Sequence, residues 1–72
     1  MPKRFRLDAR QIRSTLRRHG FTKVHQKGSH EKWHNPVTGK TVIVYEHKGR
    51  DLPRPTVRAI IEGSGIPEEE FE

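Results

Sequence analysis

The sequence predicts an α+β domain of two layers, in which two helices cover a three-stranded antiparallel sheet in the order α-β-β-β-α. Three observations support this fold class. A capped amphipathic segment spans residues 9–19, three strand-like segments span residues 21–26, 29–35 and 41–46, and a second helical pattern follows two prolines. Because 72 residues provide for one core only, we expect a single domain over residues 1–72.

The first helix is predicted from signals at both of its ends. Asp8 is a good N-cap residue, and Gln11 three positions later completes a capping-box pattern. Gly20 stands where a left-handed residue commonly ends a helix. Between these signals, Ile12 and Leu16 give the apolar stripe that a helix buries against a core.

Short turns separate the three strands. Lys27-Gly28 is a hairpin-type turn, and residues 35–40 are rich in turn-forming residues. Short connections favour antiparallel neighbours, so we expect a meander with the second strand in the middle.

The second strand is expected to have two different faces, because side chains alternate along a strand. If Trp33 faces the core, Glu31 lies on the same side. The opposite side then carries a basic, imidazole-bearing row outside the core, formed by His30, Lys32 and His34. Burial of Trp33 is favoured over the alternative of an exposed platform for base stacking.

A second helix is predicted after Pro53 and Pro55, which suit a first helical turn. Gly63 and Gly65 are expected to end it, and Phe71 in a short final turn is expected to cap the core. Its buried face is formed by Val57, Ile60 and Ile61.

Charge is segregated along the chain. The net charge is +6; residues 1–30 carry nine Lys or Arg against one acid, whereas five acids and no Lys or Arg follow Arg58. This asymmetry favours a polyanionic partner, above all a nucleic acid, over a charge that serves only solubility. Within the first helix, Arg10, Arg13 and Arg17 form one stripe, which is either a phosphate-contacting ridge or an ordinary solvated face.

Composition excludes several other classes. The chain has no cysteine, which excludes disulfides and thiolate metal sites and fits a cytoplasmic location. The longest apolar run, residues 42–45, is far too short to span a membrane. A third strand that is apolar on both faces is expected to be covered or to await a partner.

The five histidines raise the question of a metal site. In a strand, His30 and His34 would stand about 13 Å apart, at roughly 3.3 Å per residue. Two ligands of one zinc ion each lie about 2 Å from it, so these two cannot share an ion. A site would need distant partners such as His25 or His47, and we expect neither a metal nor another cofactor.

A catalytic role for His30 requires less. RNA carries its own nucleophile in the 2′-hydroxyl, so cleavage needs proton transfer and charge stabilisation, which one imidazole beside a cationic turn can supply. Gly28 and Ser29 would shape the approach of the phosphate, while Lys27 and Lys32 would stabilise its charge. DNA lacks that hydroxyl. The alternative is that His30 is simply a polar residue at a hairpin end.

The same residues resemble the HicA toxin family of toxin–antitoxin systems. The matching runs include His19-Gly20-Phe21 and Gln26-Lys27-Gly28-Ser29-His30, and their specific parts are Gly20-Phe21 and Gly28-Ser29-His30. Further matching elements run in the same order along nearly the whole chain: Trp33-His34-Asn35-Pro36, Asp51-Leu52-Pro53 and Gly65-Ile66.

This resemblance implies a fold similar to the double-stranded RNA-binding domain and an mRNA interferase activity, with His30 at the position of the essential histidine. It also implies a HicB-like antitoxin as partner, which would cover the active face. Two positions depart from the family pattern: Tyr45-Glu46 replaces a segment that usually contains proline before the position of His47, and Pro55 replaces a usual glycine. The role of His47 therefore stays open.

We thus expect a metal-independent endoribonuclease toxin that cleaves single-stranded mRNA, with His30 as general acid or base. The RNA backbone would be held by Lys27, Lys32 and the arginine stripe. One alternative is a non-catalytic RNA-binding module that reads duplex RNA by its shape. Another is a domain that only pairs with a partner protein.

Overall fold

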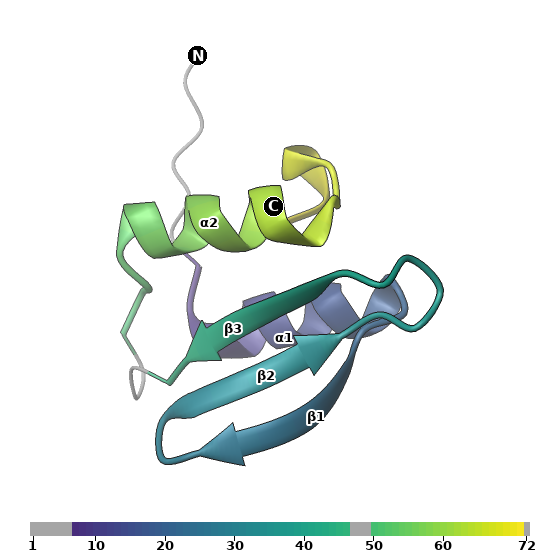
Figure 1. Ribbon diagram of the computed structural model, residues 1–72. Coiled ribbons are helices and arrows are strands. Elements are labelled where there is room, and N and C mark those ends of the chain that lie inside the picture. The colour runs from purple at the N-terminus through teal and green to yellow at the C-terminus, as the bar shows by residue number, and fades with distance from the viewer. Residues whose placement is uncertain (1–6, 47–49, 72) are drawn as a thin grey trace.

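The computed structural model describes residues 7–46 and 50–71, and its elements follow the predicted order (Figure 1). The α+β fold class with a three-stranded antiparallel sheet is confirmed. His47 lies outside the described residues. The elements are α1 (Ala9–Arg18), β1 (Thr22–Lys27), β2 (His30–His34), β3 (Thr41–Tyr45), α2 (Arg54–Ser64) and the 3₁₀ helix η1 (Glu68–Phe71).

The sheet is the expected meander, with the strand order β1-β2-β3 and antiparallel pairing throughout. The β2–β3 register pairs His30 with Tyr45 and continues without interruption to His34 and Thr41. The β1–β2 register is interrupted between Lys23 and His25, where β1 contains one extra residue. Such a bulge bends a strand and increases its twist.

Helix α1 has the predicted signals at both ends. The Asp8 carboxylate accepts the Gln11 backbone N–H at 2.9 Å, and the Gln11 side chain accepts the Asp8 N–H at 3.0 Å, which completes the capping box. At the other end Gly20 has a φ of 91°, and the N–H of the next residue, Phe21, donates to the Leu16 carbonyl at 2.9 Å. This is the Schellman arrangement, in which a left-handed glycine satisfies the last helical carbonyls.

One core lies between the sheet and the two helices. Trp33, Phe21, Ile12 and Leu16 are its largest fully buried side chains. Helix α1 lies behind the sheet in Figure 1, and α2 runs along β3, while β1 is at the far side from α2. All six residues of β1 are exposed, so the core is concentrated under β2 and β3.

Helix α2 ends at the second of the two predicted glycines. It continues through Gly63 to Ser64, and Gly65 with a φ of 72° is its C-cap. Packing explains why a glycine stands inside the helix: a Cβ at Gly63 would lie only 3.3 Å from Val42 Cγ1. The expected burial of Phe71 is confirmed at 2% exposure.

Asn35 connects the end of α1 to the β2–β3 turn. Its buried side-chain amide donates to the His19 carbonyl at 2.9 Å, and its side-chain oxygen accepts the Val37 N–H at 2.9 Å. These bonds hold the middle strand against the helix end, and thereby fix where β2 begins and ends relative to α1.

Replacing Asn35 with alanine should lower the free energy of unfolding by about 1–3 kcal/mol, because the partly buried His19 carbonyl and Val37 N–H both lose the side chain that they bond. Urea unfolding followed by circular dichroism measures this change. Val37→Ala in the same turn is the matched control, since Val37 is 90% exposed and its truncation should be nearly neutral. Equal stabilities of the two variants would contradict this role for Asn35.

Candidate functional site on the open face of the sheet

Strand β2 divides its side chains between two faces, as predicted. Glu31 and Trp33 are buried on the helix-covered face, at 3% and 1% exposure. His30 and Lys32 are exposed on the opposite face, which no helix covers within the described residues, and His34 is partly exposed on the same side. We call this side of the sheet the open face.

The register shows which side chains share the open face, because directly opposed residues of antiparallel strands point to the same side. His30 lies between Lys27 of β1 and Tyr45 of β3. Lys32 lies between His25 and Ile43. The open face therefore carries two lysines and two histidines on adjacent rows, next to an apolar β3.

His30 contacts one of its two neighbours directly. The rings of His30 and Tyr45 are 4.5 Å apart between centroids and meet at 87°, an edge-to-face arrangement. Tyr45 is 36% exposed, so both rings are accessible to solvent. The imidazole is thus held against an aromatic ring at the first residue of β2, beside the turn that connects β1 to β2.

That turn has the conformation that its glycine predicts. Gly28 has a φ of 59°, in the left-handed region that favours glycine, and a Cβ there would meet no atom within 4 Å. Space around the turn is therefore open. The Gln26 side chain donates to the Gly28 carbonyl at 3.1 Å, and the Ser29 carbonyl accepts the Glu46 N–H at 2.9 Å. Lys27, Gly28 and Ser29 are all exposed beside His30.

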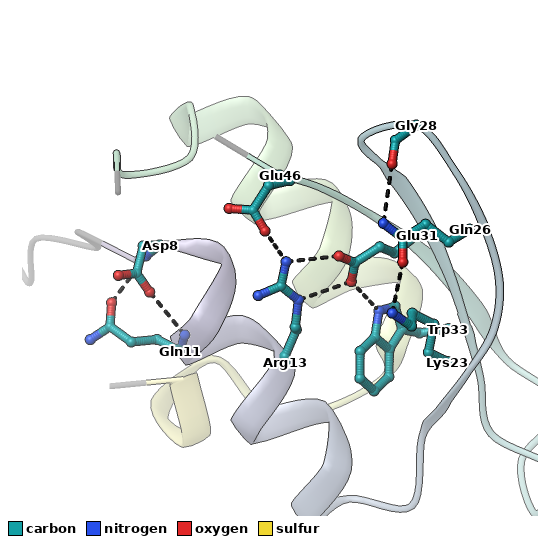
Figure 2. Close-up of polar contacts among 9 residues, drawn as sticks. All are labelled: Asp8, Gln11, Arg13, Lys23, Gln26, Gly28, Glu31, Trp33 and Glu46. Carbon is teal, nitrogen blue, oxygen red and sulfur yellow. Dashed lines mark hydrogen bonds and ion pairs between the residues drawn. The ribbon is translucent and has the colours of Figure 1, made fainter. Parts of the chain in front are cut away.

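The arginine stripe of α1 lies on the other side of the sheet. Arg13 donates from Nε to Glu31 at 2.9 Å and from an NH2 group to the same carboxylate at 2.7 Å, and it also pairs with Glu46 (Figure 2). The Arg17 guanidinium lies 5.2 Å from the centre of the Trp33 ring. Arg10 is exposed. The structure thus brings Lys27 and Lys32 to His30 but separates the three arginines from it.

Glu31 is the centre of this network. Its carboxylate also accepts the Trp33 indole N–H at 3.0 Å, so a buried acid has an arginine and an indole as donors. The hydrogen bonds from Arg13 lower the pKa of Glu31 against the opposing effect of burial, and Trp33 lowers it further. The same pairing with Glu31 raises the pKa of Arg13 above its ordinary value. Arg13 is therefore part of the interior framework.

Sequence reasoning missed the partners of Arg13, although a signal existed. Alternation placed Glu31 on the core side with Trp33, and a buried carboxylate needs a charged or hydrogen-bonding partner. The pairing of Arg13 with Glu46 and the contact between Tyr45 and His30 depend on the β2–β3 register. The turn residues alone do not define this register.

Two further properties concern metals and membranes. Among residues 7–46 and 50–71, no cluster of three His, Asp or Glu side chains has the geometry to hold a metal ion. In the same described part of the chain, no helix has the length and apolarity needed to cross a membrane.

The fold and this face define a small α-β-β-β-α domain with a histidine at the entrance of its middle strand. Residues 9–66 match the family of the HicA toxin of bacterial toxin–antitoxin systems. The chain therefore belongs to the HicA toxin family, whose members pair with antitoxins. No curated protein matches the sequence.

The Glu31 network should make stability depend on pH. A carboxylate with a lowered folded pKa stabilises the fold fully above its unfolded pKa, and this contribution is lost as the pH falls through the folded pKa. Replacing Glu31 with glutamine should cost roughly 1–3 kcal/mol at neutral pH. The difference from wild type should shrink below about pH 4, where the unfolded carboxyl is protonated.

Urea unfolding at neutral and acidic pH measures both effects. Glu62→Gln is the control, because Glu62 is 69% exposed in its side chain and its pair with Arg58 spans 3.9 Å. A pH-independent difference between wild type and the Glu31→Gln variant would show that the carboxylate does not have this role.

Proposed function

We propose that this protein is a toxin that acts as a metal-independent endoribonuclease on mRNA in the cytoplasm, with His30 as general acid or base. The observation that carries the proposal is the position of His30, exposed at the end of β2 with Lys27 opposite it. Membership of the HicA toxin family supports the toxin assignment.

The chemistry needs few protein groups. The ribose 2′-oxygen attacks the adjacent phosphorus, a new O–P bond forms, and the bond to the 5′-oxygen of the next nucleotide breaks. The 2′-hydroxyl loses a proton and the leaving oxygen gains one. His30 can perform either transfer, because an imidazole exchanges protons near neutral pH.

Neighbouring groups would stabilise the charge that develops on the phosphate. Lys27 lies opposite His30, and Lys32 points from the same face one row further along the strand. Gly28 leaves the space beside the turn open, and Ser29 adds an exposed hydroxyl. We propose that these four residues hold the RNA backbone while His30 transfers the proton.

The α1 arginines would have a separate role in RNA binding. Arg10 and Arg17 are exposed on the side of α1 away from the open face. They are suited to contact a neighbouring part of a long RNA, whereas Arg13 is held by two carboxylates. This second basic surface is the observation that favours the alternative function, a non-catalytic module that binds duplex RNA.

The antitoxin would be a HicB-like protein that covers the open face. Ile43 is 39% exposed there and Tyr45 is 36% exposed, so β3 offers apolar contact area beside His30. A partner bound to these residues would bury His30 and prevent access of RNA.

Replacing His30 with alanine should reduce the cleavage of single-stranded RNA by about 10²-fold or more, which is the usual contribution of a general acid or base. Excess chelator should leave wild-type activity unchanged, and a DNA strand of the same sequence should stay intact. Gel analysis of a labelled oligonucleotide measures all three.

His34→Ala is the matched control, since His34 lies on the same strand and face at its other end. It should retain most of the activity. Full activity of the His30→Ala protein would remove this residue from the mechanism, and tight duplex binding by a wild-type protein that cleaves nothing would favour the binding module.

A further inference from the structure

A groove runs between β3 and α2, next to the open face. It has a volume of about 430 Å³, within the range of small-molecule sites. Its lining is more apolar than polar, and its polar side-chain groups are the hydroxyls of two threonines and one tyrosine. The lining residues are Thr41, Val42, Ile43, Tyr45, Pro55, Thr56, Ala59, Ile60 and Gly63. Tyr45 belongs to this lining and also contacts His30, so it connects the groove to the proposed catalytic face.

The edge of β3 supplies backbone hydrogen-bonding groups to the groove. The Glu46 N–H donates to the Ser29 carbonyl at 2.9 Å, and the Lys40 carbonyl accepts the Asn35 N–H at 2.9 Å. In an antiparallel strand every second residue directs its N–H and C=O groups at the same neighbouring strand. Because Lys40 and Glu46 bond to β2, Val42 and Val44 between them do so too, and the residues in between direct these groups away from the sheet. Those whose N–H and C=O groups point out of the sheet edge are Thr41, Ile43 and Tyr45.

The shape of the groove selects its occupant. At the Thr41 end α2 lies against the strand, because a Cβ at Gly63 would be 3.3 Å from Val42 Cγ1 and 3.9 Å from the Thr41 carbonyl oxygen. Figure 1 shows α2 and β3 diverging toward the end of β3, where Tyr45 stands. A partner strand needs the whole edge, and α2 lies against its Thr41 end. A single planar group, which needs only part of the groove, is the better match.

We propose that this groove binds one unstacked nucleobase of the RNA, next to the phosphate that His30 acts on. The proposal rests on the proposed function and adds a subsite to it. The base lies against the Tyr45 ring and contacts Ile43 and Ala59, while Thr56 and the outward backbone groups of β3 are available to its polar edge. Single-stranded RNA meets this requirement, because its bases can leave the stack.

The site also accounts for the position of Tyr45. Because Tyr45 lines the groove and its ring contacts the imidazole, it would hold a base and a phosphate of the same nucleotide chain at neighbouring positions. Tyr45 is then a binding residue that determines where His30 meets the backbone.

The experiment uses the His30→Ala protein, so that RNA stays intact during binding. Fluorescence anisotropy compares short single-stranded oligo(A) and oligo(U) with an abasic ribose-phosphate strand of the same length. The intact strands should bind roughly tenfold or more tightly than the abasic one, as expected for a stacked base.

Two added substitutions test the groove itself. Tyr45→Ala removes the stacking ring, and Ala59→Phe fills the groove from α2; each should abolish the preference for intact over abasic RNA. Tyr45→Phe keeps the ring and should keep the preference. Val24→Ala, at an exposed apolar position of β1 outside the groove, should change nothing.

Equal binding of intact and abasic RNA, or an unchanged preference in the Ala59→Phe protein, would overturn the proposal. So would an effect of both groove variants on the binding of an antitoxin but not on that of RNA. A wild-type protein that prefers bases yet cleaves no RNA would refute the proposed activity and leave the base site standing.

Discussion

The pairing of Glu31 with Arg13 and Trp33 is the interaction on which the rest of the structure depends. A carboxylate at 3% exposure is tolerable only with donors around it, and here it has a guanidinium from α1 and the indole N–H two residues along its own strand. Loss of Arg13 would leave the buried charge of Glu31 unpaired. The network therefore fixes which side of β2 faces the helix.

His30 owes its exposure to the same constraint. It directly precedes Glu31, and successive side chains of a strand point to opposite faces. A register shift by one residue would bury the imidazole and expose the carboxylate and Trp33 together. The interior of this small domain thus positions its candidate functional residue without touching it. Helix α1, which carries Arg13, lies on the covered side of the sheet and helps to determine which residues β2 presents on the open face.

Much of this arrangement follows from local sequence rules. The capping box at Asp8, the glycine that ends α1 and the alternation along β2 depend on neighbours within a few residues, so they are predictable. The pairing of Arg13 with Glu31 and Glu46 depends on how α1 crosses the sheet. The sequence does not tell which of the two predicted glycines ends α2, because Gly63 stands inside the helix for close packing on Val42 and only the folded chain reveals this contact.

We propose that the open face acts on the ribose 2′-hydroxyl of RNA. Mass spectrometry of the fragments left by the wild-type protein tests it most directly. Attack by the 2′-oxygen predicts fragments that end in a 2′,3′-cyclic phosphate and begin with a 5′-hydroxyl. Fragments with a 3′-hydroxyl and a 5′-phosphate would come from attack by water, and would contradict it.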